Sequence, residues 1–202
     1  MRAIQGRSEP FPSLIVIDTH LVRGSSKGGT TFQDQGGPLG WTKGAKRVLA
    51  VEVTGLPLAV MVVPASTTEA DSVGQLLAQI EFQKHTERLV VVLVDKGVPK
   101  KQVLEMNASS DYEIRRYGWD KQPVDTTTGK KVFKPLKHAW KVETAHAKMM
   151  NSRRLSKSFE NTAGSATAWD NLAAIRYYYE GYVRLFAYYV YAFRVQCSLG
   201  TV

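Results

Sequence analysis

The sequence predicts an α/β fold in which a mixed sheet is flanked by helices. Three observations indicate this fold class. Short apolar runs rich in β-branched residues recur along the chain, and segments with helical spacing of apolar residues follow them. The order that results is three strands, a helix, a strand, a helix, a strand and then helices, which is typical of α/β proteins. The chain has 202 residues, enough for one domain with a sizeable core.

The first third of the chain supplies three predicted strands. Residues 1–12 contain two prolines and are predicted to be a linker. The apolar run 14–17 predicts a buried strand, and the runs 46–53 and 58–63 predict an antiparallel hairpin because turn-forming residues separate them. Residues 19–44 are rich in Gly, Ser and Lys and are predicted to be a loop. A flexible hairpin arm and simple disorder explain that loop equally well.

The middle of the chain alternates helices and strands. Apolar residues share one face of a predicted helix over 69–84. The run 89–94 is apolar at every position, which predicts a central strand covered on both faces. Pro99 is suited to the first turn of a short helix that we expect to reach about residue 106. Residues 111–116 are predicted to be an edge strand.

Two helices are predicted to follow a polar loop over 118–131. The first covers 137–157, and the second covers 167–193. The second helix has an apolar stripe, which we interpret as a face packed on the core: Ile175, Tyr179, Tyr182, Phe186 and Val190. Taken together, the order of elements is that of the ribonuclease-H-like fold.

Charge and cysteine content restrict the classes of function. The formal net charge is +9 and the pI is near 9.6, which favours nucleic acid as a partner over an anionic membrane surface. Between residues 100 and 157 there are 14 Lys and Arg against 6 Asp and Glu. The only cysteine, Cys197, excludes an internal disulfide and fits a reducing compartment. Neither a signal peptide nor a membrane span is predicted, because charges interrupt the aromatic segment 177–193.

Three carboxylates stand at positions that suggest a shared site. Asp18 directly follows the first run, Asp95 ends the all-apolar strand, and Glu143 lies in the basic helix 137–157. Sites of α/β sheets form at the carboxyl ends of strands. Carboxylates held together need a shared proton or a hard cation such as Mg²⁺. Taken singly, each Asp is an ordinary strand-end residue and Glu143 an ordinary surface partner of lysine; together, they favour the metal interpretation.

The sequence around these carboxylates resembles the DDE-type transposases of bacterial insertion sequences, specifically the insertion-sequence-five group. The similarity covers roughly residues 2–180. The motifs that carry it are GRSEPFPSLIVIDTH, GAKRVLAVEVTGLPLAVMVVPAS, VVVLVDKG, VFKPLKHAWKVETAHAKMMNSRRLSKSFE and NLAAIRYYY. The triad alone would be a weak signal, whereas these motifs in combination are specific.

The resemblance implies a function and a set of site residues. It implies metal-dependent cleavage and strand transfer of double-stranded DNA by cut-and-paste transposition, with two Mg²⁺ or Mn²⁺ ions held by Asp18, Asp95 and Glu143. It implies a homodimer acting on paired transposon ends in the bacterial cytoplasm, at the nucleoid. The predicted DNA contacts are Lys43, Lys46, Arg47, Lys148, Arg153, Arg154 and Lys157. Trp140 and Val142 match residues that seat the catalytic helix.

Several departures from the family pattern leave alternatives open. Ala139 and Thr144 stand where the family carries arginine, Val98 where it carries tyrosine, and His146 where it carries phenylalanine. His146 could be a metal ligand or a phosphate contact, but a packed or solvated histidine is the simpler interpretation. We expect a catalytic domain over residues 13–195 without the family's N-terminal DNA-binding domain. A non-catalytic DNA-binding remnant of a transposase is the main alternative, and a structure-specific nuclease of the same fold is a third.

Overall fold

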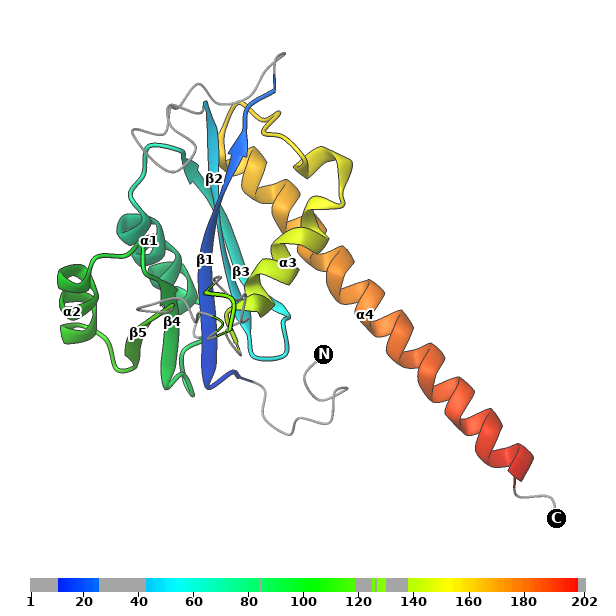
Figure 1. Ribbon diagram of the computed structural model, residues 1–202. Coiled ribbons are helices and arrows are strands. Elements are labelled where there is room, and N and C mark those ends of the chain that lie inside the picture. Colours follow the sequence, from blue (N-terminus) through cyan, green and yellow to red (C-terminus); the bar gives the residue numbers. More distant parts are fainter. Residues whose placement is uncertain are drawn as a thin grey trace.

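A computed structural model describes residues 11–25, 43–83, 85–118, 125, 127–129 and 138–199, with side chains described up to residue 181 and at 183. A five-stranded sheet has the order β3-β2-β1-β4-β5 and carries helices on both faces (Figure 1). The elements are β1 (Leu14–Arg23), β2 (Gly44–Glu52), β3 (Pro57–Pro64), α1 (Glu69–Phe82), β4 (Val91–Asp95), α2 (Lys100–Ala108), β5 (Glu113–Tyr117), α3 (Trp140–Met150), a 3₁₀ turn η2 (Arg153–Leu155) and α4 (Ala163–Leu199). This strand order confirms the predicted ribonuclease-H-like α/β fold.

The antiparallel half of the sheet is longer than the sequence predicts. β1 continues beyond Asp18 to Arg23, because every residue from Ile15 onwards pairs with β2, ending at Arg23 opposite Gly44. The prediction that residues 19–44 are all loop is therefore wrong for residues 19–23, while residues 26–42 lie outside the described residues. A Cβ on Gly44 would lie 2.0 Å from the Val22 carbonyl oxygen, so this pairing requires glycine.

One face of the sheet is covered by two helices: α1 contacts β1, β2 and β3, and α2 contacts β5. β4 pairs in parallel with β1 and β5, and β5 is the predicted edge strand. β4 is an inner strand, but β1 holds the central position. The Thr68 hydroxyl caps α1 by accepting a hydrogen bond from the Asp71 amide at 3.1 Å. The core on this face joins α1 to the sheet through Val73, Leu76 and Ile80.

The opposite face is covered by α3 and α4 (Figure 1). Val142, Ala145 and Met149 of α3 pack into a second core with β1, β2 and β3. The single helix predicted over 137–157 is wrong: α3 ends at Met150 and a 3₁₀ turn follows. The chain turns there because Leu155 enters the second core and the Ser158 amide donates to the Arg23 carbonyl at 2.8 Å.

The first turns of α4 lie along the outer strand β3. The Val62 amide donates to the Thr167 hydroxyl at 2.9 Å, and the Tyr178 hydroxyl donates to the Pro57 carbonyl. Figure 1 shows the rest of α4 extending well beyond the body. The predicted packing of its stripe on the core is wrong for Ile175 and Tyr179, whose exposed fractions are 62% and 68%. Among the described residues, no helix is both long and apolar enough to cross a membrane.

Candidate functional site

Asp18 and Asp95 reach the same edge of the sheet from neighbouring strands. The parallel pairing of β1 with β4 ends at Ile17 opposite Val94, so these two aspartates are the next residue of each strand. β4 ends at Asp95, whereas β1 continues past Asp18. The Gly97 amide donates to Asp95 Oδ2 at 3.1 Å, which orients this carboxylate. The sheet topology therefore brings the two predicted aspartates together.

Glu143 reaches this edge from α3. Its neighbour Val142 is completely buried in the core formed with β1 and β2, and this packing fixes the helix against the sheet. Glu143 itself lies in the first turn and is exposed to solvent. The Thr144 hydroxyl donates to the Trp140 carbonyl at 2.9 Å, within the helix, and adds no charge to the site.

A fourth carboxylate, Glu69, belongs to the site and was missed by sequence reasoning. The Thr19 hydroxyl donates to Glu69 Oε1 at 3.3 Å. A Cβ on Gly97 would lie 1.9 Å from Glu69 Oε2, so this carboxylate sits directly against the turn that follows Asp95. In the sequence, Glu69 is simply an acidic residue in the first turn of a helix, where the helix dipole favours it. Its position at the start of the helix that follows β3 is the only sequence feature that could have indicated a role in the site.

The other three carboxylates act electrostatically on Asp18. Burial, and then the negative charges of Asp95, Glu69 and Glu143, raise the pKa of Asp18 to about 7. Burial and the same group of charges, Asp18 included, raise the pKa of Tyr117 well above its ordinary range. Concentrated carboxylate oxygens are the donor type that suits a hard divalent cation. In the part of the chain that the structure describes, no three His, Cys, Asp or Glu side chains lie close enough together to hold a metal ion as they stand.

The raised pKa of Asp18 predicts a stabilising substitution. Because the folded pKa lies above the ordinary value of 3.8, the charged carboxylate destabilises the folded protein, and this penalty grows as pH rises towards 7. Asp18→Asn is therefore expected to raise the free energy of unfolding by about 4 kcal/mol near pH 8 and by less than half as much near pH 5. Urea unfolding in a chelator at both pH values measures this. Asp111→Asn is the control, and an equal gain at both pH values would contradict the electrostatic explanation.

His146 is a buried histidine of α3 that lies next to a half-buried histidine, His20. Its ring centroid is 5.6 Å from that of His20 on β1, and its exposed fraction is 4%. Burial, followed by the charges of His20 and Arg47, lowers the pKa of His146 to about 3. Neither ring nitrogen makes an aligned hydrogen bond with any described residue. The histidine is packed in the interior, as the simpler interpretation predicted.

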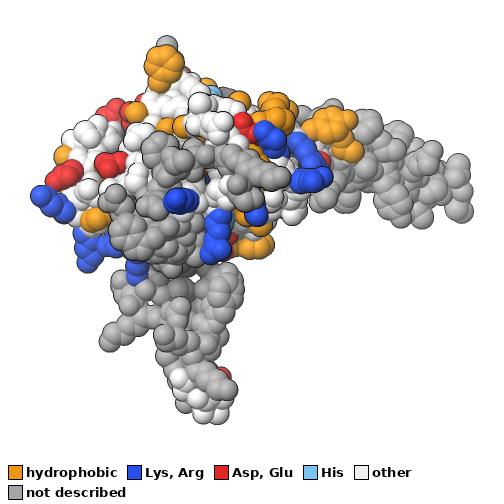
Figure 2. All heavy atoms as spheres, turned by 90° about the horizontal axis from the view of Figure 1, so that it is seen from above, with side chains coloured by type: hydrophobic (Ala, Val, Ile, Leu, Met, Phe, Trp, Pro, Cys, Tyr) orange, Lys and Arg blue, Asp and Glu red, His pale blue; other side chains and the backbone are white. Residues whose placement is uncertain are grey.

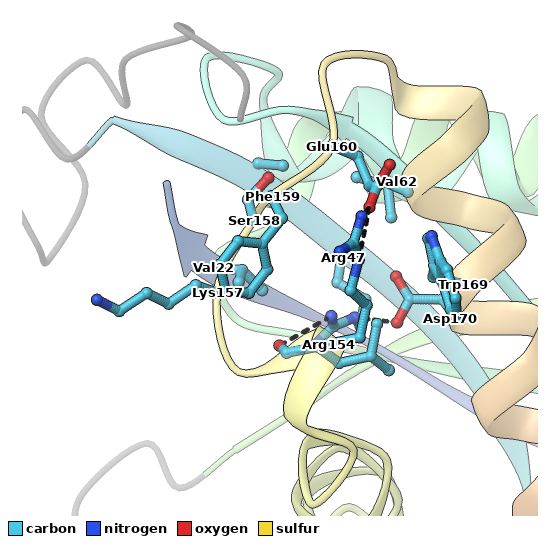
Figure 3. A pocket seen from close by; sticks show the side chains of 13 residues that line it. Val22, Arg47, Val62, Arg154, Lys157, Ser158, Phe159, Glu160, Trp169 and Asp170 are labelled. Carbon is cyan, nitrogen blue, oxygen red and sulfur yellow. Dashed lines mark hydrogen bonds and ion pairs between the residues drawn. The ribbon is translucent and has the colours of Figure 1, made fainter. Parts of the chain in front are cut away.

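Two of the residues predicted to contact DNA are buried. Arg47 forms an ion pair with Asp170 of α4, with Nε 2.5 Å from Oδ1, and both side chains are at most 4% exposed (Figure 3). Burial raises the pKa of Asp170 to about 6, although Arg47 opposes the shift. Lys46 donates to the Thr67 carbonyl at 2.5 Å. Both cations are enclosed by the fold, so this structure does not present them to a phosphate, and we omit them from the proposed DNA surface.

The other predicted DNA contacts are accessible from solvent. Lys43, Lys148, Arg153, Arg154 and Lys157 are all exposed. The Lys148 ammonium lies over the Tyr177 ring, 5.0 Å from its centroid. Blue Lys and Arg side chains are visible near the root of α4 in Figure 2.

Arg154 is more constrained than the other exposed cations. Its Nε donates to Glu160 at 2.9 Å, and its guanidinium lies 5.2 Å from the Trp169 ring centroid and 5.6 Å from that of Phe159. These side chains line a small pocket beside the Arg47–Asp170 pair (Figure 3). None of the four carboxylates lines it. Among the cations after α3, Arg153 and Lys157 are therefore better placed than Arg154 to meet a phosphate.

One family of known proteins matches most of the chain. A family model described as "Transposase DDE domain" matches residues 9–177. Among solved structures, the chain is similar to the piggyBac transposase in a synaptic complex with hairpin DNA, at 12% identity and a TM-score of 0.31. That similarity covers 62% of this chain and 27% of the other, so the chain spans about a quarter of that protein's length. No curated protein matches the chain.

Proposed function

The chain belongs to the transposase DDE domain family, and on this premise we propose that it is the catalytic domain of a transposase of the insertion-sequence-five group. It would cleave DNA strands at the ends of a mobile element and join them to target DNA. The observation that supports this best is that Asp18 and Asp95 lie side by side at one edge of the sheet and that the charges of Asp95 and Glu143 both act on Asp18. All three lie within the matched residues.

Each carboxylate has a separate structural support. Asp18 and Asp95 are held by the rigid pairing of β1 with β4, and the Gly97 amide fixes the orientation of Asp95. Glu143 stands on a helix and is exposed, so it is the member of the triad best able to adjust its position. Glu69 is held by Thr19 and adds a fourth negative charge. The two aspartates would therefore form the fixed part of the site, and Glu143 would complete it from α3.

The donor set fits divalent cations. Asp18, Asp95 and Glu143 would hold Mg²⁺ or Mn²⁺, which when bound would activate the attacking oxygen and stabilise the leaving one at a phosphodiester. Burial, together with the negative charges of the neighbouring carboxylates, raises the pKa of Asp18. A nearby positive charge would lower the pKa and leave the carboxylate ionised at neutral pH.

A Mn²⁺-soaked crystal, read by anomalous scattering, tests the site without knowledge of the DNA ends. We expect a peak among Asp18, Asp95 and Glu143, and none in the Asp95→Asn variant. A well-ordered crystal with no peak in saturating Mn²⁺ would remove the metal site from the proposal.

The proposed partner is double-stranded DNA, engaged by a homodimer at the nucleoid. Residues 13–195 would form the catalytic domain, preceded by a linker over 1–12. The exposed cations Lys43, Lys148, Arg153, Arg154 and Lys157 would contact phosphates of the bound DNA. A basic surface around an acidic centre suits a reaction on a polyanion.

Arg153 provides a test of the phosphate contacts. Arg153→Ala is expected to lower affinity equally across DNA sequences and to reduce the slope of log K against log salt by about one. Arg154→Ala is expected to have the smaller effect, because Glu160 already binds its guanidinium. Fluorescence anisotropy over a salt series measures both slopes. Lys101→Ala, at an 88% exposed side chain on α2, is the control, and an unchanged slope for Arg153→Ala would exclude it from the contacts.

A DNA-binding remnant without catalytic activity is the second candidate. The observation that favours it is Thr144, which stands where the resemblance implies an arginine and whose hydroxyl bonds within the helix. This candidate predicts salt-dependent DNA binding with no cleavage in Mn²⁺. Metal-dependent nicking of DNA by the wild-type chain would eliminate it.

A further inference from the structure

The outward face of α4 carries an exposed apolar stripe. The large apolar side chains along it are 40% to 68% exposed, and they are Trp169, Leu172, Ile175, Tyr179 and Val183. The inward face of the same helix is packed, since Ala173 and Ala174 belong to the core below the sheet. Figure 2 shows orange apolar side chains at the root of the extending helix. The carboxylate site uses none of these residues, and only Trp169 contacts the basic surface, through Arg154.

The spacing of the stripe is that of a two-helix interface. Starting at Leu172, apolar residues in the sequence alternate steps of three and four, the heptad pattern of helices that pack side by side. They are Leu172, Ile175, Tyr179, Tyr182, Phe186, Tyr189 and Phe193. The sequence over 185–193 is apolar throughout. A helix that is apolar on all sides is normally covered by other protein.

The body of the same chain does not cover the described part of this stripe. Leu172, Ile175 and Tyr179 are each more than half exposed, and α4 extends away from the sheet (Figure 1). A membrane is a poor occupant because Arg176 and Glu180 form an exposed ion pair at 2.7 Å between the apolar positions.

We propose that the stripe is covered by the α4 helix of a second copy of this chain. A heptad stripe is self-complementary, so two copies related by a two-fold axis can each cover the other's exposed residues. This contact would be the interface of the homodimer in the proposed function. Its biological role, but not its formation, rests on that proposed function. The dimer itself requires neither DNA nor cleavage.

The area available is sufficient for a stable dimer. A buried aromatic side chain contributes roughly 150–250 Å². The heptad positions from Leu172 to Phe193, five of them aromatic, would bury up to about 1,000 Å² on each copy if they were covered completely. A standard stable interface needs about 800 Å² per partner. The stripe therefore meets the requirement without a contribution from the body.

Sedimentation velocity of the full chain without DNA tests the proposal. We expect the wild type to form a dimer, with twice the 22.5 kDa of the chain, in a concentration-dependent manner. The double variant Ile175→Glu and Tyr179→Glu is expected to raise the dimer dissociation constant at least about a hundredfold. Circular dichroism checks that it is folded, and Ile175→Ser with Tyr179→Ser serves if it is not.

The matched control places the same charges on exposed apolar residues elsewhere. Phe82→Glu with Leu104→Glu changes side chains that are 89% and 69% exposed on α1 and α2, and the dimer should persist. A wild-type monomer at every concentration would overturn the proposal, as would a dimer that survives the α4 substitutions. Wild-type monomers that co-sediment with anionic phosphatidylglycerol vesicles, when the α4 variant does not, would show that lipid covers the stripe instead. If the chain forms the dimer but does not cleave DNA, the dimer proposal stands and only the proposed catalytic function is contradicted.

Discussion

Asp95→Asn is expected to reduce Mn²⁺-dependent nicking of supercoiled plasmid by about a thousandfold or more, because a cation at the site stabilises the transition state by several kcal/mol. The aspartate ends β4 beside Asp18, so the substitution removes one of the two carboxylates on the rigid part of the site. The amide has nearly the same shape as the carboxylate, and we expect the fold to be unchanged. DNA affinity, measured by anisotropy, should stay within about twofold because Asp95 contributes no positive charge to phosphate contacts.

The control for this experiment is Asp111→Asn. Asp111 is an exposed aspartate just before β5, and because β4 and β5 are parallel it lies at the end of the sheet away from Asp95. Nicking should be unaffected. Full activity in the Asp95 variant would exclude this residue from catalysis, and loss of DNA binding together with nicking would contradict the division between carboxylates and cations.

The second large effect is expected in stability. Arg47→Met leaves the carboxylate of Asp170 buried without its partner, and breaking a buried pair in this way costs about 3–5 kcal/mol of unfolding free energy. The guanidinium also donates to the Leu155 carbonyl at 3.4 Å, so its loss removes a link between β2, η2 and α4. Urea unfolding monitored by circular dichroism measures the change.

A double variant separates the lost pair from lost packing. Arg47→Met combined with Asp170→Leu replaces both charges by apolar groups, and most of the stability should return. The salt dependence of DNA binding by the folded double variant should match the wild type. An unfolding free energy unchanged in Arg47→Met, with a smaller salt slope, would instead restore Arg47 to the DNA surface.

The fold could be predicted because its signals are local. The runs over 58–63 and 89–94 are apolar and rich in β-branched residues, and the helix over 69–84 has a clear apolar face. Each of these elements can therefore be predicted from its own residues alone. The extension of β1 past Asp18 could not be predicted, because residues 19–23 mix polar and apolar side chains. Their strand conformation depends on pairing with β2, which is distant in sequence.

The candidate site was harder to predict because it depends on which distant residues meet. Asp95 followed from the rule that sites form at strand ends, whereas Asp18 lies inside β1, where the pairing with β4 stops. Glu69 enters only through Thr19 and Gly97. The cationic run around Arg47 looks the same in sequence whether it faces solvent or the interior. The ion pair with Asp170 of α4 shows that Arg47 faces the interior. Likewise, Ile175 and Tyr179 form a stripe whose partner the periodicity alone does not identify.

The contacts of α4 with β3 have a consequence for solubility. An outer strand with free amides and carbonyls is a template for strand addition by other molecules, and it promotes aggregation. Thr167 accepts a hydrogen bond from the Val62 amide, and Tyr178 donates one to the Pro57 carbonyl. The helix therefore protects this edge of the sheet from pairing with another strand. Loss of α4 would open β3 to uncontrolled strand addition. One helix can thus restrict self-association to a defined two-helix contact while it blocks the route that leads to fibres.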